Sequence, residues 1–200
     1  MRIAQIALVA LLAMGASSMA GETAPDLDLI NGKVGGTFVG SPRKEFAKRL
    51  AKGGETIGTW TAFRDKGYFV QHAGLRNMAG FSMMKGSWPD RLYGFEPYVG
   101  KISFGITAQS TLEEVKAALL EGFGGNFVLT LEEERGVWNR DYVAYQLTAW
   151  KTDPPFYFEI FFKKNRKVEE IRIKSFPGSY YPQLLRDRAL GPHAIEKHLQ

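Results

Sequence analysis

An alternating stretch near the carboxyl end of the chain places the tightest limit on the fold. Phe156–Phe162 has the sequence FYFEIFF, Val168–Lys174 has the sequence VEEIRIK, and the polar segment KKNRK separates them. Alternation with a period of two is typical of a strand with one buried face, and a polar break between two such runs predicts a hairpin. The chain is therefore expected to contain an antiparallel sheet, with KKNRK as a solvated turn.

The same alternation assigns side chains to the two faces of this sheet. The set expected in the core comprises Val143, Tyr145, Leu147, Ala149, Phe156, Phe158, Ile160, Phe162, Ile171 and Ile173. The opposite set mixes aromatic, amide and charged side chains, which is the composition of a protein-binding hot spot. We therefore predict a protein-binding surface formed by Trp138, Tyr142, Gln146, Trp150, Tyr157, Glu159, Phe161, Arg172 and Lys174. The alternative is that a helix at Leu184–Leu190 covers this face.

Two helices are predicted from capping signals and one-sided apolar patterns. The first would begin at Ser41 as N-cap, with Pro42 in the first helical position, and would end at Gly53. The second lies in GITAQSTLEEVKAALLEGFGG, where Ser110 or Thr111 precedes a glutamate by three residues, as in a capping box. Because this second helix has only about three turns, it must pack on a sheet to be stable.

Each predicted helix is followed by short segments of strand type. After the first come Thr59–Phe63, Gly67–His72 and Gly80–Met84, which are rich in aromatic residues or methionine. The predicted fold class is therefore α+β, an antiparallel sheet with helices packed on one face, built from two tandem helix-then-strands units. These units would span 21–97 and 98–178, with a C-terminal helical tail at 179–200. A single α+β domain without a repeat is the alternative.

The first twenty residues have the pattern of a secretory signal peptide. Arg2 precedes the apolar run Ile3–Ala16, and small residues surround a cleavage point near Ala20. We therefore expect a periplasmic or secreted protein without a stable membrane anchor. The sequence contains no cysteine. Since no disulfide can form, the exported fold would have to rest on its apolar core.

The charge balance bears on the kind of partner. The chain has 26 lysines and arginines against 21 aspartates and glutamates. In an exported protein, a basic excess favours acidic proteins, anionic glycans or membrane surfaces over nucleic acid. We expect another protein as the partner, with no nucleic acid.

Catalytic residue types are sparse. The three histidines have no metal-binding or triad spacing around them, and there is no cysteine nucleophile. Ser41–Lys44 matches S-x-x-K, but helix capping accounts for Ser41. The acidic run that contains Glu132 and Glu134 leaves a hydrolase with an acidic pair as a third hypothesis. We predict no catalytic residue, no cofactor and no metal.

One stretch of the chain carries a family resemblance. GITAQSTLEEVKAAL is followed by a glycine, a Y-x-Y strand, an F-x-F-E-I-x-F strand and a K-V-E-E-I-R-I strand. This succession resembles the repeat of the beta-lactamase-inhibitor proteins and of the outer-membrane assembly lipoprotein small protein A, in which helices pack on one face of an antiparallel sheet. The resemblance implies a non-enzymatic protein that binds another protein through the open sheet face or its loops. We expect an inhibitor or immunity protein that blocks a secreted enzyme or toxin, with an envelope assembly or maintenance factor as the alternative.

Overall fold

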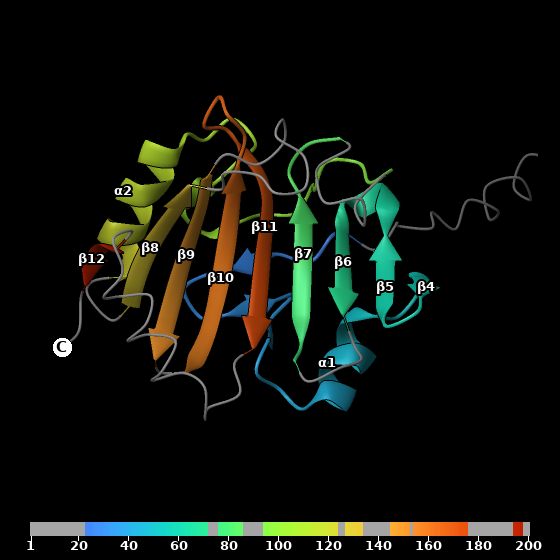
Figure 1. The fold of residues 1–200 in the computed structure, drawn as a ribbon. Helices are drawn as coiled ribbons and strands as arrows, with labels where there is room; N and C mark the ends of the chain where they lie inside the picture. The colour runs from blue at the N-terminus through green and yellow to red at the C-terminus, as the bar shows by residue number, and fades with distance from the viewer. Residues whose placement is uncertain are drawn as a thin grey trace, which may run out of the picture.

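The main feature of the molecule is one large antiparallel sheet (Figure 1). The computed structural model describes residues 23–71, 76–85, 94–123, 127–133, 145–152, 154–175 and 194–197. Within these ranges the sheet has nine strands, in the order β12-β8-β9-β10-β11-β7-β6-β5-β4. Their bounds are β4 (Glu55–Ile57), β5 (Trp60–Phe63), β6 (Tyr68–Gln71), β7 (Met78–Ser82), β8 (Phe127–Glu133), β9 (Tyr145–Thr152), β10 (Pro155–Phe162), β11 (Val168–Ser175) and β12 (Ala194–Lys197).

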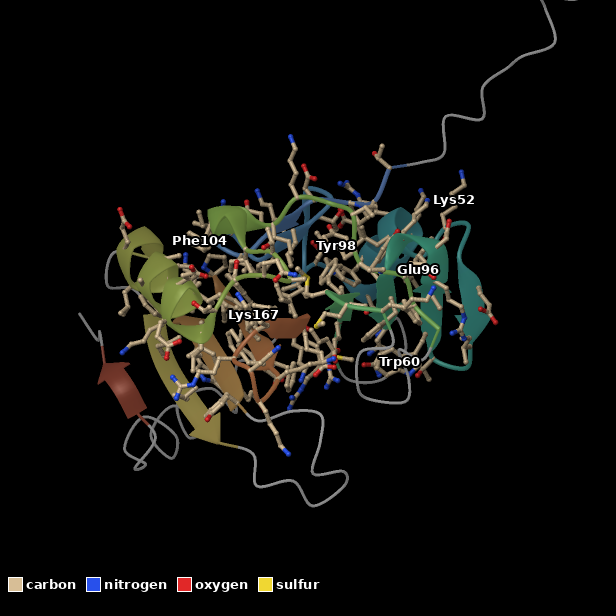
Figure 2. The ribbon with its side chains drawn as sticks, turned by 90° about the horizontal axis from the view of Figure 1, so that it is seen from above. Lys52, Trp60, Glu96, Tyr98, Phe104 and Lys167 are labelled. Carbon is tan, nitrogen blue, oxygen red and sulfur yellow. The ribbon has the colours of Figure 1, made fainter. Side chains whose placement is uncertain are left out.

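The remaining elements lie behind the large sheet in the view of Figure 1 and above it in Figure 2. Apart from η1 (Arg64–Lys66), the short 3-10 turn that joins β5 to β6, they are the helices α1 (Arg43–Leu50) and α2 (Leu112–Phe123), the 3-10 turn η3 (Ser103–Gly105), and a small sheet of β1 (Leu27–Asp28), β2 (Lys33–Val34) and β3 (Thr37–Phe38). The fold is therefore mixed α+β, as predicted, but strands dominate it. The layer behind the sheet is not made of helices alone.

The small sheet was not predicted, because its two-residue strands are too short to show a pattern. Tertiary contacts hold it in place. The Leu27 amide donates to the Lys101 carbonyl at 2.7 Å, and the Leu29 amide donates to Ser103 Oγ at 2.9 Å. Leu27, Leu29 and Val34 are fully buried. Burial of these apolar side chains therefore contributes to holding the small sheet against the rest of the fold.

The predicted hairpin is confirmed as β10 and β11. The register pairs Phe158 with Ile173 and Ile160 with Ile171, all on the core side. The turn between the strands is exposed, but it is not solvated throughout. Arg166 pairs with Glu113 near the start of α2, and the Lys167 ammonium donates to the Gln109 carbonyl. The basic turn therefore fastens α2 to the sheet.

Alternation predicted the core correctly wherever the structure describes it. The predicted core residues of β9, β10 and β11 are buried, except Tyr145, which is half-buried against the same cluster, while Val143 lies outside the described residues. Helix α2 covers this part of the sheet. The Phe123 ring lies 4.8 Å from the Phe127 ring and 5.8 Å from the Phe158 ring, between centroids.

The two helix starts differ in how they are capped. At α2, Thr111 Oγ1 accepts from the Glu114 amide at 3.2 Å, and Glu114 Oε2 accepts from the Thr111 amide at 2.7 Å, so the capping box is confirmed with Thr111 as cap. At α1 the prediction of Ser41 as N-cap is wrong, since no side chain caps this helix. The Asn77 side-chain amide instead donates to the backbone carbonyls of Val39 and Ser41, which precede α1.

The structure describes little of the two ends of the chain. Residues 1–20, the expected signal peptide, lie outside the described residues. Of the tail at 179–200, only Ala194–Lys197 is described, and it is a strand paired with β8 rather than the expected helix. No helix in the described part of the chain is long and apolar enough to cross a membrane.

The sheet brings two similar runs of strands together. Helix α1 is followed by β4 to β7 and α2 by β8 to β11, and within each run consecutive strands pair side by side. The runs meet at their last strands, where β7 pairs antiparallel with β11 and Phe81 lies opposite Ile171. A continuous sheet therefore carries side chains from both halves on one surface.

Candidate binding face

We call the side of the large sheet that faces away from both helices and the small sheet the front face. Directly opposite residues of antiparallel strands point to the same face of a sheet. The strand registers therefore align rows of side chains across the front face from β9 to β4. One row is Trp150, Tyr157, Lys174, Met78, Gln71, Trp60 and Ile57, and the next is Thr148, Glu159, Arg172, Gly80, Phe69, Ala62 and Glu55.

The structure brings most of the predicted binding residues together on this face. Gln146, Trp150, Tyr157 and Phe161 lie there but are buried, with Trp150 only 4% exposed. The three charged members are half-buried: Glu159, Arg172 and Lys174. Trp138 and Tyr142 lie outside the described residues. Alternation therefore assigned these side chains to one common face of β9 to β11, but it did not show that the aromatic side chains there are buried.

We call Glu159, Glu170, Arg172 and Lys174 the ion-pair cluster. Lys174 Nζ lies 2.5 Å from Glu159 Oε2, and Arg172 contacts Glu170 through Nε at 2.5 Å and Nη2 at 3.0 Å. The Arg172 guanidinium also lies over the Phe161 ring at 4.7 Å. These pairs satisfy the cationic charges within the sheet, so Arg172 and Lys174 offer less to an acidic partner than the sequence indicated.

Burial sets the protonation behaviour of this cluster. It raises the pKa of the Glu170 carboxyl to about 7, against the opposing attraction of Arg172. It lowers the pKa of the Lys174 ammonium, although Glu159 favours the charged form. Beside the cluster, the Trp150 and Tyr157 rings stack with centroids 4.4 Å apart. This half of the front face is a packed polar and aromatic layer.

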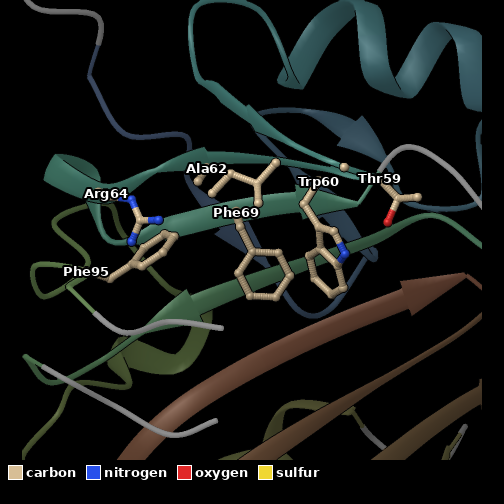
Figure 3. Close-up of a pocket in the computed structure, with 8 residues that line it drawn as sticks. Thr59, Trp60, Ala62, Arg64, Phe69 and Phe95 are labelled. Atoms are coloured by element: carbon tan, nitrogen blue, oxygen red, sulfur yellow. The ribbon is translucent and has the colours of Figure 1, made fainter. Parts of the chain in front are cut away.

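The other half of the front face contains a hollow, which we call the aromatic pocket (Figure 3). Its volume is about 620 Å³. This size lies within the range of roughly 300–1,000 Å³ that is typical of pockets for small molecules and cofactors, and it is large enough for a partner's side chain. The lining residues are Ile57, Gly58, Thr59, Trp60, Ala62, Arg64, Phe69 and Phe95. Its walls are aromatic rings and aliphatic groups, with one guanidinium at the edge.

Three rings from separate segments form the pocket wall. The Trp60 and Phe69 centroids are 4.6 Å apart, and those of Phe69 and Phe95 are 6.5 Å apart. Phe95 comes from an irregular segment that the backbone holds against the sheet, since the Glu96 amide donates to the Arg64 carbonyl at 2.8 Å. The three rings therefore come from two strands, β5 and β6, and one fixed loop.

Small residues on the front face make room for this hollow. Gly80 lies opposite Phe69, and a Cβ at Gly80 would overlap the Phe69 ring. The ring can therefore lie across β7 only because residue 80 has no side chain. Ala62, the neighbour of Phe69 on β5, contributes only a methyl group. In the half of the front face formed by β9 to β11, the same row contains the larger side chains of Arg172 and Glu159.

The rim of the pocket combines an ion pair with an exposed apolar side chain. The Arg64 guanidinium lies 5.3 Å from the Phe95 ring centroid and 2.9 Å from Glu55 Oε2. Ile57 belongs to β4, the last strand of the sheet, and is 42% exposed. Arginine stacked on an aromatic ring is a common element of protein-binding hot spots. The pocket thus has the chemistry for holding an apolar group.

The structure bears only in part on the histidine and acidic residues that the sequence offered for catalysis or metal binding. No group of three or more histidine, cysteine, aspartate or glutamate residues that could hold a metal ion is present among the described residues. The three histidines and Glu134 lie outside these residues, and the side chain of Glu132 is not described.

Comparison with known proteins adds no relative: no family model, curated protein or solved structure matched this chain. The pocket therefore has to be judged on its own geometry. Sequence reasoning missed it, although Trp60 and Phe69 fall in two segments that were predicted as strands. The sequence did show aromatic residues in two of these strand segments and small residues, Ala62 and Gly80, in neighbouring ones. Nothing in the sequence indicated that Phe95 would join Trp60 and Phe69.

Proposed function

We propose that this chain is an exported, non-enzymatic protein-binding module, an inhibitor or immunity protein that blocks a secreted enzyme or toxin. The aromatic pocket on the front face is the observation that carries this proposal. An apolar side chain of the partner would enter the pocket between Trp60, Phe69 and Phe95, and the partner's body would cover the rim. Export rests on the signal-peptide pattern of residues 1–20.

The order of elements supports a construction from two tandem helix-then-strands units. Each run has one helix followed by four consecutive antiparallel strands, and the runs join at β7 and β11. This succession is also what the resemblance to the beta-lactamase-inhibitor proteins and small protein A implies. In such an arrangement the helices cover one face of the sheet, and the opposite face is open to a partner.

The contents of the pocket favour a protein partner. Buried aromatic anchors in a desolvated pocket, ringed by polar contacts, dominate the binding energy of protein interfaces. Trp60, Phe69 and Phe95 supply such aromatic surface, and the Arg64–Glu55 pair lies at its edge. The ion-pair cluster lies in the sheet beside this site. The sequence predicted a binding surface on β9 to β11, whereas the proposed contact centre is the pocket on β4 to β6.

The test begins with isolation of the partner. The purified chain without residues 1–20 serves as bait against the secreted and envelope proteins of its source. The proposal expects one stoichiometric complex that survives size-exclusion chromatography, and loss of the partner's enzymatic or toxic activity within that complex. The free chain should show no turnover of peptidoglycan or peptide substrates.

Two outcomes would contradict the proposal. Recovery of outer-membrane assembly machinery, with no activity inhibited, would favour the alternative of an envelope assembly or maintenance factor. Turnover of a substrate by the free chain, abolished by Glu132→Ala or Glu134→Ala, would favour a hydrolase.

A further inference from the structure

A second group of basic residues in the described chain lies on α1, away from the front face. Residues 43–52 have the sequence RKEFAKRLAK, which contains five basic residues and the single acid Glu45. Glu45 pairs with Arg49 at 3.0 Å. The other four basic residues form no ion pair with any described residue, and all are exposed: Arg43, Lys44, Lys48 and Lys52.

The helix geometry places two of these charges opposite the core, while Arg43, three residues before Phe46, flanks the buried side at the exposed first turn. Phe46 and Leu50, at 0% and 6% exposure, point into the core. Successive residues of an α-helix are about 100° apart around its axis. Lys44 and Lys48 therefore lie on the side opposite the two buried residues. Figure 2 shows Lys52 pointing outward on the helix side, whereas Trp60 lies on the opposite side of the sheet.

The helix is held firmly enough to present a fixed array of charge. Asn77 directly precedes β7. Its side-chain amide donates to the Val39 carbonyl at 2.8 Å and to the Ser41 carbonyl at 2.7 Å. These bonds tie the chain just before α1 to the large sheet. Phe46 is wholly buried below the helix. The backbone therefore costs little to order when a ligand binds, and only the long side chains lose freedom.

We propose that the exposed face of α1 binds an acidic polysaccharide whose carboxylates are paired by Arg43, Lys44, Lys48 and Lys52. Arginine pairs with carboxylates in bidentate geometry, and lysine supplies a mobile point charge. Lys44 and Lys48 are about 6 Å apart along the helix axis, enough to contact successive acidic sugars. Because the pocket is on the other side of the sheet, this site is independent of the proposed protein partner.

Two other polyanions fit the same face less well. An amphipathic helix that binds lipid inserts apolar side chains into the headgroup boundary. The large apolar residues of α1, Phe46 and Leu50, are instead buried in the core. Nucleic acid would not meet an exported chain, which the leader pattern predicts. The acidic glycan therefore fits best, and the two other polyanions become outcomes of the test.

The experiment measures binding of polygalacturonate by isothermal titration calorimetry. The test variant is the triple substitution Arg43→Gln, Lys44→Gln and Lys48→Gln. The matched control removes the same charge from three other segments: Lys85→Gln, Lys101→Gln and Lys164→Gln. We expect the test variant to lose at least about tenfold in affinity and the control less than about threefold, because local pairing outweighs the screened net charge.

Folding and charge type are controlled separately. Neutral substitutions on an exposed helix face should leave the unfolding midpoint nearly unchanged. The charge-preserving pair Lys44→Arg and Lys48→Arg should keep wild-type affinity. If the triple variant does not fold, Lys48→Gln alone should still weaken binding, and wild-type affinity in that variant would overturn the proposal. Equal loss in the test and control variants would overturn the proposal, as would absence of polygalacturonate binding by the wild type. Tighter binding to vesicles of 30% phosphatidylglycerol in phosphatidylcholine, or to duplex DNA, would also overturn it.

Discussion

The two halves of the front face have the same strand arrangement but opposite contents. In the half formed by β9 to β11, Glu159 and Arg172 occupy one row, and the Trp150–Tyr157 stack lies beside them. In the half formed by β4 to β7, the same row contains Gly80, Phe69 and Ala62 and leaves a hollow. The comparison shows that side chains pack closely in one half, whereas the other half has an open hollow lined by aromatic side chains.

The largest expected effect contrasts two tryptophans from the same row. Trp150 is buried and stacked on Tyr157, so Trp150→Ala should lower the free energy of unfolding by about 3–5 kcal/mol. Trp60 is half-buried at the pocket, so Trp60→Ala should cost about 1–2 kcal/mol. Urea denaturation followed by circular dichroism measures both. Equal losses would show that the two halves do not differ in this way.

In the packed half, formed by β9 to β11, Glu170 should make the free energy of unfolding depend on pH. The Glu170 carboxyl has a pKa of about 7 in the folded chain, against a usual value of 4.5. Between these values the unfolded chain releases a proton that the folded chain retains. The stability of the wild type should therefore fall as pH rises from about 4.5 to 7, by at most about 3 kcal/mol.

Glu170→Gln is the variant that isolates this effect. It removes the titrating group, so the difference in unfolding free energy between wild type and variant should change across this pH window and stay constant above it. Denaturant unfolding at pH 4.5, 6, 7 and 8 gives the comparison. Parallel curves for the two proteins throughout would contradict the assignment to Glu170.

A smaller effect is expected where the two halves meet. In Gly80→Ala the new methyl group must displace the Phe69 ring, which also forms the pocket wall. Overpacking of this kind should cost about 1–2 kcal/mol of stability. It should also change the pocket, so the affinity for the isolated partner should fall. Unchanged affinity despite the lost stability would place the contact surface elsewhere.

Secondary-structure elements could be predicted from the sequence where a short run of neighbouring residues carries the pattern. The β10–β11 hairpin follows from alternation over seven residues on each side of the turn, and the Thr111 cap follows from a four-residue motif. The burial of Trp150 and Tyr157 could not be predicted, because alternation assigns a side chain to a face without saying what covers that face. The strands β1 to β3 have only two residues each, too few for any period.

The pocket required information that no local pattern contains. Its wall joins Trp60, Phe69 and Phe95, and the space depends on Gly80 and Ala62 being opposite or beside Phe69. These neighbours come from strand register, which is set by pairing across the whole sheet. For the same reason the partners of Arg172 and Lys174 could not be assigned: the sequence indicated two exposed cations, and the folded sheet pairs both with glutamates.

The dissociation constant of the isolated partner complex tests the central claim most directly. It is measured for the wild type, for Trp60→Ala in the pocket, and for Ile30→Ala, which removes another exposed apolar side chain (38% exposed) on the β1–β2 turn. The account predicts at least about 30-fold weaker binding for Trp60→Ala, as for an interface hot spot, and no change for Ile30→Ala. Wild-type affinity in Trp60→Ala would contradict it.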